Sequence, residues 1–156
     1  AYAIWHYVHI TGDVEYLHRH GVTMLVEICR FLASRGQWSA HGGFGYYAVM
    51  GPDEFQMMVN NNAYTNYMAK RTFDYALAVL AESAPAALPC TPEEMAAWQR
   101  MAEAMIIPCD PATGIYEQHE GFFDLPHIDV DAIPVEEFPL YHHWSYDRIY
   151  RNDMIK

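Results

Sequence analysis

The sequence contains few cysteines, and they lie far apart. Cys29, Cys90 and Cys109 are an odd number at wide spacing, and no CxxC pair occurs. Disulfide frameworks and zinc knuckles depend on closely and regularly spaced cysteines, so this pattern argues against both. We therefore expect a protein of the reducing cytoplasm.

Basic residues are also scarce. The 156 residues include 9 Lys and Arg against 20 Asp and Glu, which gives a formal net charge of −11. A field of this sign repels nucleic acid and anionic membrane surfaces. The longest apolar runs fall far short of a membrane span. We expect no nucleic-acid partner and no membrane partner, and a small or neutral ligand fits better.

Recognisable metal and phosphate motifs are missing. The nine histidines include HRH at 18–20, the segment EQHE at 117–120 and the pair His142-His143. None matches HExxH or another spacing that places two ligands on one helical face with a third nearby. The segment GGFG lacks the spacing of a phosphate loop, and no GxSxG elbow occurs. We expect no metal site, with the histidines at the surface or hydrogen-bonded.

Helical periodicity is plain in the first half of the chain. Hydrophobic residues make up 52% of the sequence, which is enough for the core of one domain. Apolar residues recur at helical spacing over 13–35 and 63–82, and Gly36 predicts the end of the first helix. The second helix is apolar around its girth, which predicts burial on most sides. Between them lies a glycine-rich loop with a short strand expected at 46–50.

The second half contains one clear helix start and then many prolines. Thr91 has the pattern of an N-cap, with Pro92 at the first helical position and Glu94 closing a capping box. Residues 109–139 are proline-rich and predict a loop, and 136–150 can hold one more short helix. Long loops in a compact domain usually carry function.

The stretch GPDEFQMMVNNNAYTN, residues 51–66, is unusual before a helix. Asp53 and Glu54 follow a rigid Gly-Pro pair, in a position where a helix N-terminus would favour negative charge. A carboxylate that is fixed among apolar neighbours suits general-acid chemistry. The alternative is that the two acids merely decorate the N-terminus of a helix.

Three consecutive asparagines follow in the same stretch. Asn60, Asn61 and Asn62 can cap the helix that starts near Ala63, but one cap needs only one asparagine. The remaining amides suit either a hydroxyl-rich ligand or the backbone of neighbouring loops. Rings that could stack on sugars, or simply fill the core, are Phe44, Tyr46, Tyr47, Tyr64 and Trp144.

These segments together resemble a known family. The stretch GPDEF…VNNNAYTNYM is similar to the GPDEYH…NNAYTN signature of family-65 glycoside hydrolases, which include maltose, trehalose and kojibiose phosphorylases. The segment TGDVEYLHRHGVTMLVEICRFLASR resembles the helix that precedes this signature. Downstream, IYEQHEGFFDL resembles the family's QFDGYF.L segment, and DMIK resembles the start of its KQADV segment.

The resemblance implies a fold. The catalytic domain of the family is an (α/α)6 barrel, so we expect an all-α chain with long connecting loops. Residues 1–156 would form one fragment of that domain, from its middle. Each helix would then lack some of its neighbours, which would leave large apolar patches. We therefore expect the isolated chain either to form a homodimer through those patches or to exist within a longer protein.

The resemblance also implies an activity. Glu54 is expected to be the general acid of an inverting phosphorolysis, in which inorganic phosphate attacks an α-glucosidic disaccharide and releases β-glucose 1-phosphate. Phosphate is a co-substrate here, and no cofactor is expected. By the same resemblance Lys156 would bind the glucosyl unit. The residues that would shape the pocket around the acid are Asp53, Asn61, Asn62 and Tyr64.

Two departures from the signature leave the choice of substrate open. Gln56 stands where the signature has histidine, and Phe55 stands where it has tyrosine. The hydrogen bonding near Glu54 is therefore expected to differ. Two alternatives also stay open: a family-65 hydrolase of the trehalase or kojibiose-cleaving type, which would use water as its nucleophile, and a non-catalytic helical module.

Overall fold

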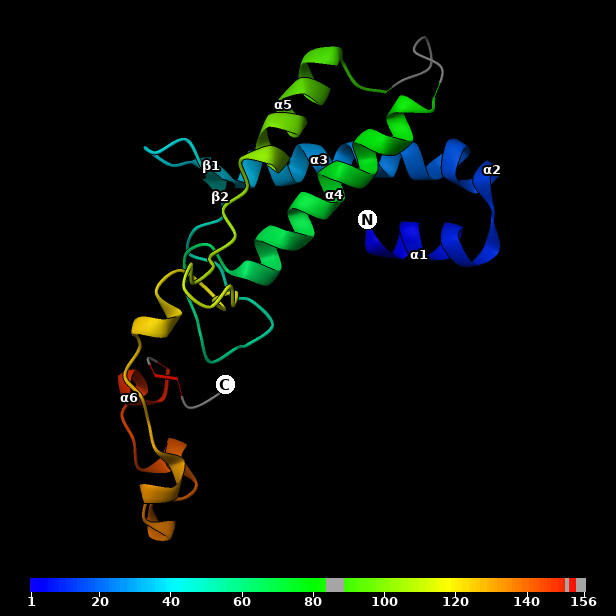
Figure 1. Ribbon diagram of the computed structural model, residues 1–156. Helices are drawn as coiled ribbons and strands as arrows, with labels where there is room; N and C mark the ends of the chain where they lie inside the picture. Colours follow the sequence, from blue (N-terminus) through cyan, green and yellow to red (C-terminus); the bar gives the residue numbers. More distant parts are fainter. Residues whose placement is uncertain (84–88, 151, 154–156) are drawn as a thin grey trace. The chain divides into compact units, whose positions relative to one another are not determined.

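The structure is a computed structural model. It describes residues 1–83, 89–150 and 152–153. The chain forms two compact units (Figure 1). The first unit contains Ala1–Tyr46 and Asn66–Ile106, and the second contains Tyr47–Thr65 and Ile107–Lys156.

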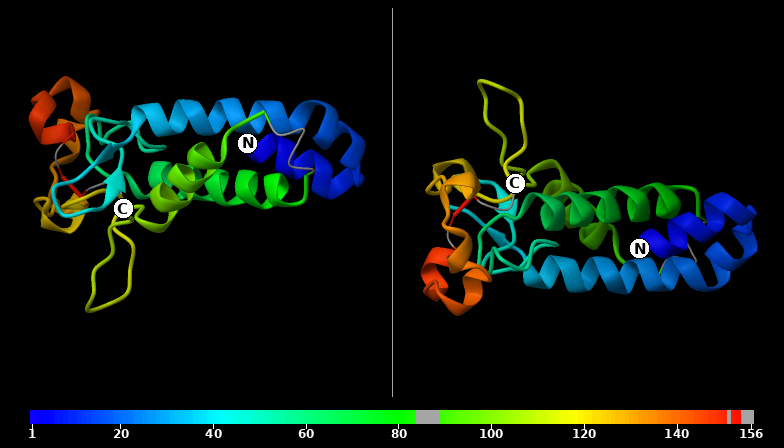
Figure 2. Two further views of the ribbon diagram at one scale, coloured as in Figure 1. Left: turned by 90° about the horizontal axis from the view of Figure 1, so that it is seen from above. Right: turned by 90° about the horizontal axis from the view of Figure 1, so that it is seen from below.

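The first unit is built from helices. Figures 1 and 2 show the first helix folding back so that it runs beside the two long helices. The elements are α1 (Tyr2–Thr11), α2 (Val14–Tyr16), the π-helical turn η1 (Leu17–Gly21), α3 (Val22–Arg35), α4 (Ala63–Ala81) and α5 (Pro92–Glu103). The first three residues of α4 belong to the second unit.

The predicted helix over 13–35 is confirmed in its position but not in its continuity. Asp13 caps its start by accepting a hydrogen bond from the backbone N–H of Tyr16, and the helix ends at Arg35 before Gly36. Between α2 and α3 the π-helical turn η1 interrupts the regular i to i+4 pattern. Gly21 ends this turn, and a Cβ there would lie 2.8 Å from Leu17 Cδ1.

The core of the first unit lies where α3, α4 and α5 meet. Leu25, Val26 and Cys29 are buried on α3, Phe73, Ala76 and Leu80 on α4, and Trp98 and Ala102 on α5. The prediction that the second long helix is buried on most sides is wrong for the described chain. One stripe of α4 is buried, whereas Tyr64 and Tyr67 near its start are 58% and 48% exposed.

A two-stranded hairpin follows α3. Strands β1 (Gln37–Trp38) and β2 (Phe44–Gly45) pair antiparallel. The prediction of a strand at 46–50 is wrong, because the second strand of the hairpin is Phe44–Gly45. The aromatic residue that holds the hairpin in place is Phe44. Its buried ring lies against Gly36, where a Cβ would come within 2.1 Å of the ring. Only glycine leaves room for that contact.

The predicted start of α5 is confirmed. The Thr91 hydroxyl accepts a hydrogen bond from the backbone N–H of Glu94, whose carboxylate accepts one from the backbone N–H of Thr91. The same carboxylate forms a two-pronged ion pair with Arg30 of α3, with N···O distances of 2.8 and 3.1 Å. The cap therefore also ties α5 to α3.

The second unit consists mainly of loops. Isolated bridges join Val49 to Val59 and Cys109 to Tyr116. The expected short helix is confirmed as α6 (Tyr146–Tyr150). The other elements are single 3-10 turns, η3 (Phe122–Asp124), η4 (Val130–Ala132), η5 (Val135–Glu137) and η6 (Leu140–His142).

The all-α prediction is confirmed in its broad form. Helices supply most of the regular structure, and long loops join them (Figure 1). The closure of these helices into part of an (α/α)6 barrel stays a prediction, as does the single-fragment organisation of residues 1–156. Within the described residues, no helix is long and apolar enough to cross a membrane.

Candidate active site

A tight turn in the second unit presents Glu54. The backbone N–H of Gln56 donates to the carbonyl oxygen of Asp53 at 3.3 Å, which closes a turn with Glu54 and Phe55 at its corners. The Glu54 side chain is exposed, and within the described ranges its carboxylate has no hydrogen-bond or ion-pair partner. The alternative that these acids decorate a helix N-terminus is wrong, because α4 begins only at Ala63.

Asp53 holds the first end of this turn. One carboxylate oxygen accepts the backbone N–H of Phe55 at 2.9 Å, and the other accepts the side-chain amide of Gln118 at 2.5 Å. Both oxygens therefore have protein donors. The half-buried Asp53 is occupied in shaping and anchoring the turn, while its neighbour Glu54 faces outward.

Gln56 holds the other end. Its side chain is buried, with its Nε2 donating to the carbonyl oxygen of Asn152 at 2.9 Å. Its Oε1 lies 3.2 Å from Nε2 of His119, which is also buried. The difference from the family signature noted at position 56 thus lies in a buried contact, two residues along the chain from Glu54.

The three asparagines all bind neighbouring parts of the same unit. The Asn60 side-chain oxygen accepts the backbone N–H of Ala48 at 3.2 Å. Asn61 donates from Nδ2 to the Glu120 carboxylate at 2.7 Å. Asn62 caps α4, because its Oδ1 accepts the backbone N–H of Thr65 at 3.0 Å. Of the two uses weighed for the surplus amides, the structure shows them bound to neighbouring loops.

Asn61 and Asn62 are buried, at 2% and 1% exposure. The Asn62 amide also donates to the Gln118 carbonyl oxygen at 3.1 Å. Asn61 has a left-handed backbone with φ of 50°, a region that asparagine tolerates better than most residues. Two other residues of the loop, Ala48 and Met58, share this uncommon conformation, with φ of 53° and 57°. The loop around Glu54 is therefore strained and closely fastened.

The remaining predicted site residues differ in their surroundings. Tyr64 is 58% exposed in the first turn of α4, and its side chain makes no ring contact or hydrogen bond with the other described residues. Lys156 lies outside the described residues. Of the aromatic rings considered for sugar stacking, Phe44, Tyr46 and Trp144 are buried.

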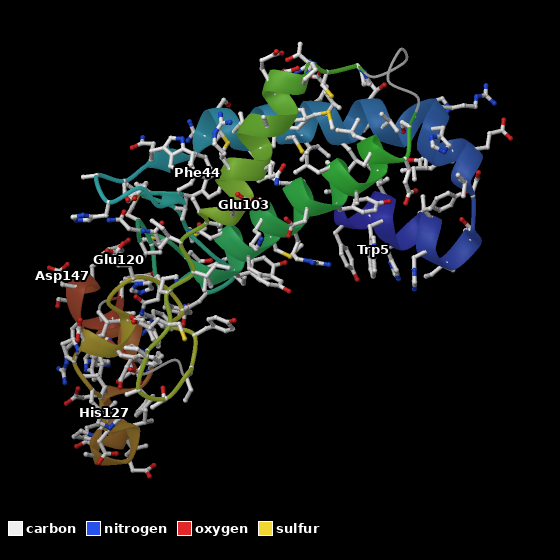
Figure 3. All side chains as sticks on the ribbon, turned by 45° about the horizontal axis from the view of Figure 1, so that its top comes forward. Trp5, Phe44, Glu103, Glu120, His127 and Asp147 are labelled. Carbon is white, nitrogen blue, oxygen red and sulfur yellow. The ribbon has the colours of Figure 1, made fainter. Side chains whose placement is uncertain are left out.

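The segment Gln118–Glu120 was missed as a functional element. Gln118 binds Asp53, His119 binds Gln56, and Glu120 binds Asn61. Two backbone contacts reinforce these, since Gln118 accepts the N–H of Ala63 and Glu120 donates its N–H to Asn60. Figure 3 labels Glu120 in this region of the second unit. Residue spacing offers EQHE only a metal-binding interpretation, whereas the resemblance of IYEQHEGFFDL to the family's QFDGYF.L segment is the signal that points to this site.

Other features lie away from this turn. A cavity of about 440 Å³ in the first unit is lined by α1 and α4, including Tyr2, Trp5 and Tyr75, and by none of the predicted site residues. Trp5 is labelled in Figure 3. Within the part of the chain that the structure describes, no three His, Cys, Asp or Glu side chains are grouped closely enough to hold a metal ion. All three cysteines are free thiols.

Comparison with known proteins agrees with the resemblance in sequence. Alpha,alpha-trehalose phosphorylase from Thermoanaerobacter brockii is 36% identical over 167 residues, which cover 99% of this chain and 22% of that protein. Maltose phosphorylase from Bacillus subtilis (strain 168) is 36% identical over 160 residues, which cover 99% of this chain and 21% of that protein. The chain therefore spans about a fifth of the length of these relatives.

A solved structure is also similar. It is assigned as a kojibiose phosphorylase from human microbiome, and it matches with a TM-score of 0.89 and 46% sequence identity. The match covers 99% of this chain and 22% of that one. The family model described as glycosyl hydrolase family 65 central catalytic domain matches residues 1–156. This chain therefore belongs to glycosyl hydrolase family 65.

Proposed function

We propose that this chain carries the general acid of a disaccharide phosphorylase. In this proposal Glu54 protonates the glycosidic oxygen of an α-glucosidic disaccharide of the maltose, trehalose or kojibiose type. Inorganic phosphate attacks the anomeric carbon from the opposite face, and the C–O bond to the leaving sugar breaks. The products are β-glucose 1-phosphate and the released sugar.

The observation that carries the proposal is the Asp53–Gln56 turn. Both of its ends are fastened by side-chain hydrogen bonds, while the carboxylate at its corner is exposed. A general acid needs this combination, because its proton must reach a substrate oxygen at a fixed position. The relatives compared above are phosphorylases by name, which favours phosphate over water as the nucleophile.

A single carboxylate suits this chemistry. An inverting hydrolase needs a second carboxylate, about 6.5–9.5 Å from the first, to activate water. Phosphate is already anionic and needs no such base. Glu54 is thus sufficient as the acid, and no cofactor takes part.

The other predicted site residues receive roles that follow from their contacts. Asp53, Asn61 and Asn62 shape the pocket by holding the loop, since their polar groups bind neighbouring segments. Tyr64 offers an exposed ring and hydroxyl to a sugar. Lys156 is proposed to bind the glucosyl unit, on the resemblance alone. A homodimer and a cytoplasmic location stay predictions.

The experiment compares the intact enzyme that contains this chain with its Glu54→Gln variant. Each is incubated with maltose, trehalose and kojibiose, with and without inorganic phosphate, and β-glucose 1-phosphate and free glucose are quantified. We expect phosphate-dependent release of β-glucose 1-phosphate from one of the three sugars. The variant should lose about 10²–10⁴-fold in kcat, the usual contribution of a general acid.

Each other outcome has a clear meaning. Free glucose released without phosphate would move the enzyme to the hydrolases of the family. Full activity in Glu54→Gln would exclude Glu54 as the acid. Glu93→Gln, on the exposed first turn of α5, is the matched control and should leave the activity unchanged.

A further inference from the structure

We propose that His119 is a positioning residue for Glu54, acting through its buried contact with Gln56. This inference rests on the function proposed above and extends it to a residue with no role assigned so far. His119 lies 65 positions along the chain from Glu54, and it is held in the same unit.

The position of the Glu54 carboxylate is fixed by its backbone. Glu54 has no partner of its own among the described residues, so only the backbone of the Asp53–Gln56 turn sets its position. That turn has two anchored ends. Asp53 is tied to Gln118 at 2.5 Å, and Gln56 lies between His119 at 3.2 Å and the Asn152 carbonyl oxygen at 2.9 Å. A shift of either anchor moves the acid.

The His119 ring is itself firmly held. Its ring is buried at 5% exposure and packs edge-on against Phe122, with ring centroids 5.3 Å apart. Its Nδ1 donates to the Glu120 carbonyl oxygen at 3.0 Å, because a carbonyl can only accept. The ring is thus held by two contacts besides Gln56, which makes it a stiff support for Gln56.

The contact between His119 and Gln56 depends on the orientation of the Gln56 amide. With the Gln56 amide nitrogen donating to Asn152, its oxygen faces His119 Nε2. The two ring nitrogens of His119 therefore each face an oxygen, one of Glu120 and one of Gln56. Turning the amide over would instead aim its oxygen at the Asn152 carbonyl oxygen. A side chain without a donor at position 119 would leave the Gln56 oxygen buried and unpaired.

This chain differs from the family segments at the same two positions. Gln56 stands where the signature GPDEYH has histidine, and His119 stands where the segment QFDGYF has phenylalanine. The two departures touch each other in the structure. We therefore expect the residues at 56 and 119 to function as a unit, so that changing both costs less than the single changes predict.

The test uses two substrates in the intact enzyme. One is the disaccharide that the enzyme cleaves, whose leaving group needs a proton. The other is α-glucosyl fluoride, whose leaving group depends far less on protonation. His119→Phe keeps an aromatic ring on Phe122 and removes the donor. We expect it to lower kcat for phosphorolysis of the disaccharide about 10–100-fold, with a smaller change in KM and with little change for the fluoride.

The ratio of the two rates does not depend on how much of the variant is folded. Gln56→Met removes the contact between Gln56 and His119 from the Gln56 side, so it should also lower the ratio of the disaccharide rate to the fluoride rate. This variant replaces His119→Phe in the test if His119→Phe is poorly produced. The double variant Gln56→His with His119→Phe should recover part of the ratio. His142→Phe, an exposed histidine in the same unit, is the matched control and should match the parent.

The outcomes separate this inference from the proposed function. A disaccharide-to-fluoride ratio equal to the parent's in both His119→Phe and Gln56→Met would overturn the positioning role. An equal loss on both substrates would also overturn it, because a general structural defect behaves in that way. If Glu54→Gln itself shows no selective loss on the disaccharide, the proposed function fails first.

Discussion

Gly51 and Asn62 lie in such close contact that no side chain fits between them. A Cβ on Gly51 would lie 2.2 Å from Nδ2 of Asn62. The Asn62 amide cannot move away freely, since it caps α4 through Thr65 and donates to Gln118. The glycine before Pro52 is therefore required by the same amide that starts the helix.

Gly51→Ala should destabilise the protein by about 1–3 kcal/mol, the usual cost of forcing a carbon into a packed site. Chemical denaturation of the parent and the variant measures this difference. Gly114→Ala is a useful comparison, because that position has open space and only a left-handed φ of 71°. In combination with Asn62→Ala, the effect of Gly51→Ala should shrink; equal effects in both backgrounds would contradict the steric explanation.

Asn61 combines a left-handed backbone with a hydrogen bond to Glu120. Asn61→Ala loses the amide and keeps a Cβ at φ of 50°, whereas Asn61→Gly loses the amide without that strain. The alanine variant should therefore be less stable than the glycine variant by about 1 kcal/mol. Thermal unfolding of both variants tests this order, and the reverse order would show that the left-handed conformation is not kept.

The ion pair between Arg30 and Glu94 predicts a pH dependence of stability. The hydrogen bond from Arg30, together with the backbone N–H of Thr91, lowers the pKa of Glu94 from 4.5 to about 2. A carboxyl whose pKa is lower in the folded state stabilises that state above its unfolded pKa. This stabilisation is complete above about pH 4.5 and is lost as the pH falls toward 2.

Glu94→Gln should therefore lower the unfolding temperature at pH 7, and the difference from the parent should narrow between pH 4.5 and 2. The variant also weakens the capping box of α5, which is independent of the ion pair. Glu93→Gln, exposed in the same helical turn, is the matched control and should show little of this pH dependence. A difference that stays constant down to pH 2 would show that the charge of Glu94 contributes nothing.

Local signals in the sequence predicted the elements that local interactions determine. The capping box at Thr91 and the cap at Asn62 were predictable, because each joins residues three positions apart. The strand at 46–50 was not, because the hairpin depends on the fit of Phe44 against Gly36. The π-helical turn η1 could not be predicted from hydrophobic periodicity, because a single π-turn shifts the hydrogen-bond spacing by only one residue.

The candidate site was predictable only in part for the same reason. The acids of the Asp53–Gln56 turn could be found from their neighbours in sequence. The residues that fasten it are 63 to 96 positions away in chain order, and no spacing rule connects them. The resemblance of two separate segments to one family was the sequence signal that assigned both segments to one site. The hydrogen bonds between the two segments are the physical reason that they form one site.

The three free cysteines should differ strongly in reactivity. Burial raises the pKa of the Cys29 thiol to about 12, and its side chain is fully buried in the core of the first unit. Cys109 is exposed, and Cys90 lies between these extremes with its pKa also raised by burial. Because the thiolate is the reactive form, Cys109 should react first with a thiol reagent at pH 8.

The reaction is followed by the absorbance of an aromatic disulfide reagent, with and without denaturant. In the folded protein one thiol should react rapidly, and Cys29 should react only when the first unit unfolds. Cys109→Ser should remove the rapid phase and leave the slow ones unchanged. A rapid reaction of Cys29 in the folded protein would mean that α3 and its neighbours open more readily than their packing indicates, since the thiol has no other route to solvent.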